Sequence, residues 1–163
     1  MTTSENGNEI REQTRKLQER WGRQTLDVKG WTGIPTLLLE RQQMLKLDPV
    51  DMNILLVLLS HWWNKEKMPF PSRKKIAETI DRDVGTVRRH IKKLEDSGLV
   101  CREKRFLAGG NGQTSNIYHL DGLVQRLAKE AEQEAKEQKA RDDEDSAKRR
   151  GRPKVKRESE ADA

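Results

Sequence analysis

The sequence predicts a mainly helical α+β fold with one small β-hairpin. Three observations predict it: apolar residues at helical spacing in the middle of the chain, two β-prone segments around a Gly-rich turn, and polar, helix-compatible sequence at both ends. Only 33% of the 163 residues are hydrophobic and 37% are charged, so the whole chain cannot form one core. Apolar residues concentrate between Ile34 and Leu127, where we expect one modest core.

Shifts in composition divide the chain into four parts. Near the N-terminus, the polar stretch from Asn8 to Trp21 lacks Gly and Pro and is expected to be helical, and Gly30 and Gly33 interrupt the linker that follows. The C-terminal segment is low in complexity and is expected to be disordered. The predicted parts are an N-terminal helix with its linker (1–33), a folded domain (34–120), a C-terminal helix (121–141) and a tail (142–163).

Capping residues and apolar spacing predict the helices of the folded domain. Asp48 followed by Pro49 begins a helix that is apolar on nearly every side and is therefore expected to be the buried centre. Two amphipathic helices follow, with Ser72 and Asp83 as N-caps and Gly98 as the stop of the second. The residues expected to face the core from this second helix are Val84, Val87, Ile91 and Leu94.

A β-hairpin is predicted after Gly98. The segment "LVCREKRF" is β-prone, "LAGGNGQTS" is a turn, and "NIYHL" is a second strand. Two amphipathic helices joined by a tight turn and followed by a hairpin are the arrangement of a winged helix-turn-helix. Cys101, the single cysteine, is expected to be a small buried hydrophobe and has no partner for an internal disulfide.

The helix from Val84 to Ser97 has a basic solvent face. Arg89 lies almost opposite the apolar positions, in the half of the helix that meets base edges in DNA-binding members of this class. Arg89 can donate two hydrogen bonds to guanine, and Thr86 offers a hydroxyl or methyl contact, whereas most other cations are expected to contact phosphates. The predicted DNA contacts of the domain are Ser72, Arg82, Thr86, Arg88, Arg89, Lys92, Lys93, Arg102, Lys104 and Arg105.

The segment "FPSRKKIAETIDRDVGTVRRHIKKLEDSGLV" resembles the winged helix-turn-helix domain of phage and plasmid replication proteins and related bacterial regulators. The matching elements are an aromatic-Pro-Ser entry, an Ile-Ala pair, Thr-Val in the recognition helix, a Leu-Glu-x-x-Gly-Leu ending, and "TSNIY" at the second strand. The resemblance covers about residues 35–120 and implies DNA binding. One departure stands out: Asp81-Arg82-Asp83 replaces the family's Gly-Val-Ser turn. Asp83 can still cap the helix, but two carboxylates at this position would repel DNA phosphates.

The formal net charge of +6 favours an anionic partner, and double-stranded DNA is the partner we expect. The alternative from a different class is a winged-helix adaptor that binds protein, with the basic face merely solvated. Three histidines (His61, His90 and His119) lack Cys or His partners at ligand spacing, and no nucleophile motif or carboxylate pair is evident. We therefore expect no metal, cofactor, small-molecule ligand or catalytic site, and no apolar run is long enough to span a membrane.

The C-terminal helix carries small and apolar residues four apart, at Leu123, Leu127, Ala131 and Ala135. This stripe indicates either pairing with a second copy, which gives a homodimer for a symmetric DNA site, or a solvated helix held by intrahelical Glu–Lys pairs. Both alternatives stay open.

The tail is strongly basic, with seven cations and no acid from Lys148 to Arg157. Within it, Arg150, Gly151, Arg152 and Pro153 resemble the core of an AT-hook, which implies that the arginines enter the narrow minor groove of A·T-rich DNA. The preceding "RDDEDS" is expected to be a mobile linker whose acids mask the basic run until DNA competes for it.

Taken together, these features predict a bacterial or phage protein that binds double-stranded DNA sequence-specifically, in the cytoplasm and associated with the nucleoid. Transcriptional regulation is the favoured role, because no helicase-loading, nuclease or polymerase pattern follows the domain. A replication-initiation or plasmid-maintenance factor is the second hypothesis.

Overall fold

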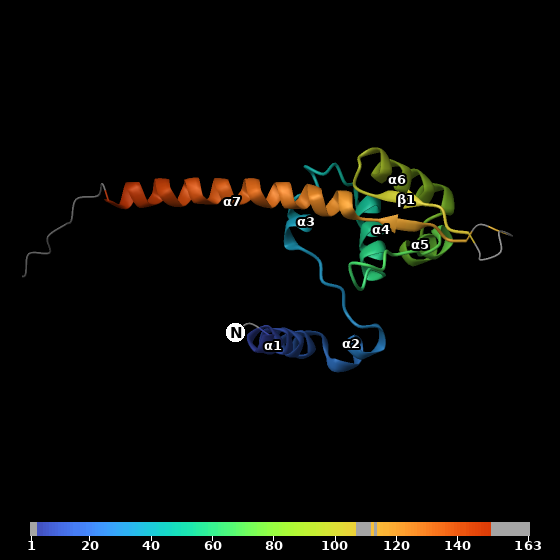
Figure 1. Ribbon diagram of the computed structural model, residues 1–163, viewed down its shortest axis with the longest axis horizontal. Helices are drawn as coiled ribbons and strands as arrows, with labels where there is room; N and C mark the ends of the chain where they lie inside the picture. The colour runs from blue at the N-terminus through green and yellow to red at the C-terminus, as the bar shows by residue number, and fades with distance from the viewer. Residues whose placement is uncertain (1–2, 107–111, 113, 151–163) are drawn as a thin grey trace, which may run out of the picture.

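The computed structural model describes residues 3–106, 112 and 114–150 (Figure 1). Within them the chain forms seven helices and one two-stranded sheet, so the expected mainly helical fold with a hairpin is confirmed. None of these helices is both long enough and apolar enough to span a membrane. The elements in chain order are α1 (Thr3–Trp21), α2 (Arg23–Lys29), α3 (Thr36–Glu40), α4 (Pro49–Ser60), α5 (Arg73–Ile80), α6 (Val84–Asp96), β1 (Cys101–Glu103), β2 (Ile117–His119) and α7 (Asp121–Arg150).

Helix α4 is the centre of the domain, as its all-round apolar sequence predicts. It buries Ile54, Leu55 and Leu58 completely and packs against α5 and α6. Its start is fixed by a reciprocal cap: the Asp48 carboxylate accepts hydrogen bonds from the backbone N–H groups of Val50 (2.9 Å) and Asp51 (3.0 Å). The Asp51 carboxylate in turn accepts from the Asp48 N–H at 3.0 Å, and Pro49 occupies the first turn.

Helices α5 and α6 pack on α4 through the residues that the spacing predicts, with one exception. Ile76 of α5 and Val87 and Ile91 of α6 are fully buried. Val84 is 45% exposed, so the expectation that it faces the core is wrong. Val84 shares the helical face of Val87 and Ile91, but as the first residue of α6 it lies at the exposed end of that face. Gly98 ends the helix in the left-handed region (φ 71°), as expected.

The β1–β2 hairpin is antiparallel and pairs Arg102 with Tyr118 and Cys101 with His119. Tyr118 is fully buried, and its N–H donates to the Pro69 carbonyl (2.9 Å), which ties the extended segment before α5 to the hairpin. Successive strand residues point to opposite faces, so the inward position of Tyr118 places the Cys101–His119 pair on the outer face. Cys101 is accordingly exposed, and its predicted burial is wrong.

Helix α7 is joined tightly to the turn between α6 and β1. The Leu123 N–H donates to the Leu99 carbonyl (2.9 Å), and Leu123 is buried. Gly122 approaches so closely that a Cβ there would overlap the carbonyl oxygen of Gly98. Further along, Glu134 forms an ion pair with Arg41, just after α3. The first turns of α7 therefore have a fixed position on the domain.

Beyond this anchor α7 continues as a helix to Arg150, whereas the sequence predicted an end near Arg141 and disorder from residue 142. Contacts between side chains one helical turn apart stabilise this extension: Gln138 donates to Asp142 (2.9 Å), and Lys148 pairs with Glu144 (2.8 Å). The segment "RDDEDS" is therefore part of the helix and not a mobile linker. Two of its acids, Asp142 and Glu144, contact side chains one helical turn away, so the expectation of a mobile acidic mask over the basic run is wrong.

The N-terminal region contains two helices where one was expected. Helix α1 ends at Trp21 as predicted, but α2 occupies much of the predicted linker. In Figure 1 both lie apart from the domain, connected by the extended segment that contains Trp31. This segment, the end of α4 and the start of α7 border an apolar groove of about 610 Å³. Trp62 is packed against the core at the groove, whereas Trp63 is 70% exposed.

Candidate nucleic-acid interface

The α6 helix is held by one face and presents the other to solvent. Val87, Ile91 and Leu94 are buried, and the cations on the opposite side of the helix, Arg88, Arg89 and Lys92, are exposed. Arg82, just before the helix, is exposed as well, and its guanidinium donates to the Asp81 carbonyl (2.8 Å). The basic solvent face that the helical wheel predicts is therefore present.

The turn before α6 begins with a residue in a left-handed conformation. Asp81 adopts the left-handed region (φ 52°, ψ 58°), which Gly occupies most easily and which Asp tolerates better than most residues. Asp83 caps the helix by accepting from the Thr86 N–H at 2.8 Å. Hydrogen bonds from the Thr86 hydroxyl and N–H hold the pKa of Asp83 below its usual range. The left-handed backbone of Asp81 and the carboxylate of Asp83 thus both serve the turn itself.

A chain of hydrogen bonds orders Arg89 on the helix surface. The Thr86 hydroxyl donates to the Asp83 carboxylate (2.6 Å) and accepts from an Arg89 guanidinium N–H (2.8 Å). The guanidinium is therefore held near the N-terminal half of α6, with N–H donors left for a further acceptor. This is the half of a recognition helix that meets base edges.

Two residues of α6 are bonded to the start of α4. The His90 Nδ1 lies 2.7 Å from the Asp51 carboxylate, which is fully buried, and 3.5 Å from that of Asp48. The Lys93 ammonium donates to Asp48 (2.8 Å) and to Asp51. These hydrogen bonds, to Asp48 first and then to Asp51, raise the pKa of Lys93. Lys93, which the sequence predicts as a DNA contact, is thus engaged inside the domain.

The same network determines the ionisation of Asp48. Desolvation alone would raise the pKa of this carboxyl, but hydrogen bonds from the Lys93 ammonium and the Asp51 N–H outweigh it and hold the pKa well below its usual range. Asp48, Asp51 and His90 have the donor types of a metal site, with their ligand atoms within 4.8 Å of one another. The Lys93 ammonium already supplies the cation among them, so we assign the group as an ion-pair network.

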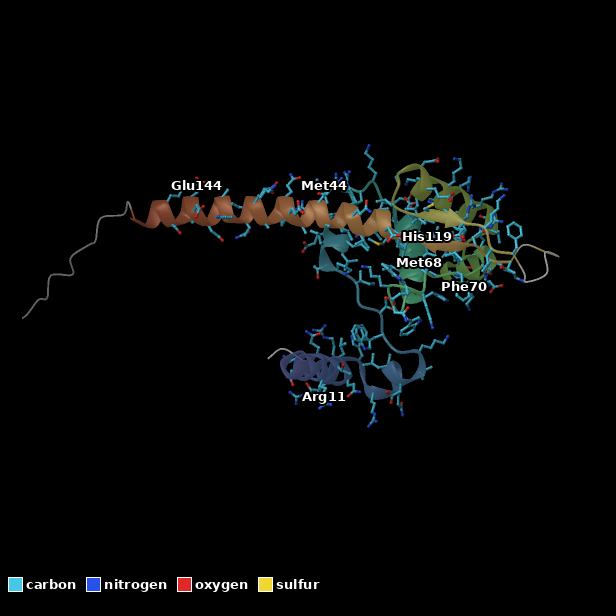
Figure 2. All side chains as sticks on the ribbon, in the orientation of Figure 1. Arg11, Met44, Met68, Phe70, His119 and Glu144 are labelled. Carbon is cyan, nitrogen blue, oxygen red and sulfur yellow. The ribbon has the colours of Figure 1, made fainter. Side chains whose placement is uncertain are left out.

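Two of the three wing cations hold the hairpin against the domain. The Arg105 guanidinium lies over the Phe70 ring (4.4 Å to its centroid), and its Nε donates to the Thr114 hydroxyl at 2.9 Å. Arg102 pairs with Glu95 of α6 at 3.3 Å. Lys104 is exposed. Figure 2 places Phe70 at the end of the molecule opposite Glu144 of α7.

The structure thus brings most of the predicted DNA contacts to one end of the domain and gives several of them internal partners. Ser72 caps α5 by accepting from the Lys75 N–H (3.1 Å), and Lys92 pairs with Asp96 (2.9 Å). The wing tip around Gly109 and Gly110 lies outside the described residues, as do Gly151, Arg152, Pro153 and the side chain of Arg150. Asp51 was missed by sequence reasoning, although a lone acid in an otherwise apolar helix was the available signal.

One family model and one solved structure support this architecture. A family model described as a helix-turn-helix domain matches residues 45–100. The solved N-terminal domain of the DnaD protein from Geobacillus kaustophilus HTA426 is similar at 20% identity, over 69% of this chain and 89% of that chain, with a TM-score of 0.51. A possible transcriptional regulator from Methanosarcina mazei Go1 is similar at 20% identity, over 64% of this chain and 82% of that chain, with a TM-score of 0.42.

A third solved structure, the MepR–DNA complex from S. aureus, has 14% identity over 69% of this chain and 89% of that chain, with a TM-score of 0.39. No curated protein matches the chain. Residues 45–100 form a helix-turn-helix domain, and the β1–β2 hairpin that follows makes the fold a winged helix-turn-helix.

Proposed function

We propose that this protein binds double-stranded DNA sequence-specifically and acts as a transcriptional regulator. In this proposal α6 enters the major groove, the wing contacts the flanking backbone, and the basic tail grips an A·T-rich minor groove. The observation that supports it most is the ordered Asp83–Thr86–Arg89 chain on the exposed basic face of α6. An arginine held in position loses less side-chain entropy when it donates to guanine, which favours specific recognition.

In this proposal the role of each cation depends on whether it is exposed or already bonded within the domain. Arg88 and Arg89 are exposed on α6 and Lys104 is exposed on the wing, so all three are accessible to a duplex. Arg102, Arg105 and Lys93 are bonded within the domain and in this proposal act by positioning the wing and α6, with residual attraction for phosphates.

Selection of bound fragments from the host genome, followed by salt titration on the enriched duplex, tests the proposal. We expect enrichment of promoter fragments and an affinity that falls steeply with salt, because phosphate contacts release counterions. Enrichment of an origin would redirect the role to replication initiation or plasmid maintenance. An absence of duplex binding at low salt would overturn DNA binding altogether and favour the protein-binding adaptor.

A further inference from the structure

A shallow hollow on the surface of α6 is lined by three nitrogen-bearing side chains, those of Arg89, His90 and Lys93. Its volume of about 370 Å³ leaves room for a phosphate group. Arg89 and His90 lie one helical turn before Lys93, so the three side chains share one side of the helix. Arg89 also belongs to the exposed basic face of α6. The hollow therefore borders the surface that the proposed function assigns to DNA.

Each of the three side chains keeps hydrogen-bonding capacity beyond the contacts already described. The Lys93 ammonium carries three donors, of which two bond to the carboxylates at the start of α4. The Arg89 guanidinium donates to Thr86 and has further N–H groups. The ring nitrogen Nε2 of His90 has no hydrogen-bond partner among the described residues, and the side chain is 20% exposed. All three residues can thus donate to one more acceptor, provided that the His90 ring carries a proton at Nε2.

The contact with Asp51 determines which form of the His90 ring can bind a phosphate. A carboxylate only accepts, so Nδ1 of His90, 2.7 Å from the Asp51 oxygen, is the donor of that hydrogen bond. In a neutral ring the proton is then on Nδ1, and Nε2 carries a lone pair that repels a phosphate oxygen. Only the imidazolium has a second N–H, at Nε2, to donate. A phosphate contact at His90 therefore requires a second ring proton.

Asp51 is a fixed anion behind the ring. Its side chain is fully buried, and its other oxygen accepts from the Asp48 N–H (3.0 Å) and from the Lys93 ammonium. All of these partners are donors, as an ionised carboxylate requires. Because Asp51 cannot move away from its partners in α4, the His90 ring is held in one orientation on α6.

The charges around the hollow show what the second ring proton changes. Asp48 and Asp51 face the His90 ring from the start of α4, at 3.5 Å and 2.7 Å from Nδ1. On α6, Arg89 and Lys93 line the hollow beside it. Helix α5 also packs on α6, but within the described residues no charged side chain of α5 bonds to His90. The two carboxylates and the two cations cancel, so an imidazolium gives the group one net positive charge, which attracts a phosphate.

We propose that the hollow binds one phosphate of the DNA backbone and that His90 takes up a proton when the phosphate binds. His90 is then a further DNA contact, and Lys93 both bonds to α4 and donates to the phosphate. This inference rests on the proposed function, because it takes α6 as the helix that meets the duplex. Since the bound state holds more protons than the free state, the affinity for duplex rises as the pH falls.

The affinity of the full chain for duplex, measured against pH, tests this coupling. The probe is a duplex from the genomic selection, titrated by fluorescence anisotropy at constant ionic strength between about pH 8 and about pH 6, where histidine side chains change charge. We expect the affinity to rise about tenfold over this range, since uptake of one proton changes an equilibrium by at most about tenfold per pH unit.

The variant His90→Asn separates phosphate binding from a purely structural role. Its amide nitrogen can take the place of Nδ1 and keep the hydrogen bond to Asp51, but the side chain has no second nitrogen and does not titrate. We expect it to match the parent protein at about pH 8 and to bind about tenfold more weakly at about pH 6. His61→Gln is the matched control, because His61 caps the opposite end of α4, and its pH profile should equal that of the parent.

A second test changes the duplex and leaves the protein intact. Each backbone phosphate of the selected duplex is replaced in turn by a neutral methylphosphonate. We expect replacement at one position, or at one symmetric pair of positions, to remove the pH dependence, because the group that fills the hollow then lacks its charge. If no position does so, the proton is not linked to a backbone phosphate, and the inference is overturned.

The outcomes separate this inference from the proposed function. If the full chain binds no duplex at either pH, the proposed function fails, and the phosphate site at His90 fails with it. If the affinity is equal at the two pH values, DNA binding stands and the phosphate site alone is overturned. The same conclusion follows if His90→Asn keeps the pH profile of the parent.

Discussion

Helices α6 and α7 are both rich in charged residues, but different forces hold them in place. Helix α6 buries Val87, Ile91 and Leu94, and its His90 and Lys93 bond across to α4. Helix α7 buries Leu123 near its start, packs Leu127 partly, and then continues with side-chain contacts along its own length. The conformation of α6 thus depends on the tertiary fold. The conformation of α7 beyond Glu134, which we call outer α7, depends on its local sequence.

This difference indicates what each helix can do. A helix fixed by packing and by a buried carboxylate can hold an arginine in one place, which recognition of a base requires. A helix fixed by its own side chains can set a distance but cannot orient a partner finely. The packing of α7 also affects the prediction of a homodimer through its stripe of small and apolar residues. Leu123 and Leu127 of this stripe pack on the domain, and the two remaining members are alanines. The solvated alternative for outer α7 is therefore favoured over pairing of two copies.

The largest effect is expected from Asp51→Ala, which would leave His90 and Lys93 without their buried partner. We expect a loss of about 3 kcal/mol in the free energy of unfolding, measured by urea denaturation near neutral pH. Asp96→Ala is the matched control, since Asp96 pairs with Lys92 on the exposed side of α6 and should contribute less than about 0.5 kcal/mol. Equal losses would mean that the buried network does not hold α6.

Gly122→Ala should have the next largest effect, because the new methyl group would overlap the Gly98 carbonyl where α7 joins the domain. We expect a loss of about 1–3 kcal/mol, seen as a lower midpoint of thermal unfolding. Gln125→Ala, at an exposed position in the same helix, should change stability by less than about 0.5 kcal/mol. An unchanged unfolding midpoint in Gly122→Ala would show that α7 is not packed tightly against Gly98.

Arg89→Ala tests whether the packing of α6 serves base recognition. We expect a loss of about 1–3 kcal/mol of binding free energy at the preferred site, with relaxed specificity and unchanged stability, by fluorescence anisotropy on matched and mismatched duplexes. Arg88→Ala, a neighbouring exposed cation, should weaken all sequences alike. A uniform loss in Arg89→Ala would assign Arg89 to the phosphates instead.

The lowered pKa of Asp48 predicts a dependence of stability on acid. The native state binds fewer protons at this carboxyl than the unfolded chain, so its contribution is present above the ordinary carboxyl pKa of about 4 and is lost as the pH falls below it. Asp48→Asn keeps an N-cap but cannot ionise, so its stability should fall less steeply over that range. Parallel profiles for the two proteins in thermal unfolding would contradict this assignment.

The smallest effect on stability is expected from Ala140→Pro. If outer α7 depends only on its own sequence, interrupting it should leave the unfolding of the domain within about 0.5 kcal/mol of the parent, while circular dichroism reports lost helix. A clear drop in the unfolding midpoint would mean that outer α7 packs on the domain after all.

The sequence predicts those parts of the fold that local chemistry determines. The caps Asp48, Ser72 and Asp83 and the stop at Gly98 are confirmed, because each acts within a few residues of its own position. The outward face of Cys101 depends on its pairing with β2, and the bonding of Lys93 depends on Asp51 of α4. These features arise from contacts distant in the sequence, so local patterns do not encode them.

The candidate site shows the same division. The exposed basic face of α6 follows from helical spacing, whereas the internal bonding of Arg102 and Arg105 follows from where Glu95 and Phe70 lie in the tertiary fold. The unexpected length of α7 has another cause: acids and bases at helical spacing stabilise a segment whose polar composition alone suggests disorder.

The apolar groove contains most of the residues that give the protein its intrinsic fluorescence. All four tryptophans precede α5 in the chain, and Trp31, Trp62 and Trp63 border the groove. The described parts of α5, α6, the hairpin and α7 contain no indole. Intrinsic emission therefore combines three indoles at the junction of α4, α7 and the N-terminal segment with the exposed Trp21 of α1. A change in emission on adding duplex would report an effect at these indoles and not on the exposed face of α6, which carries none.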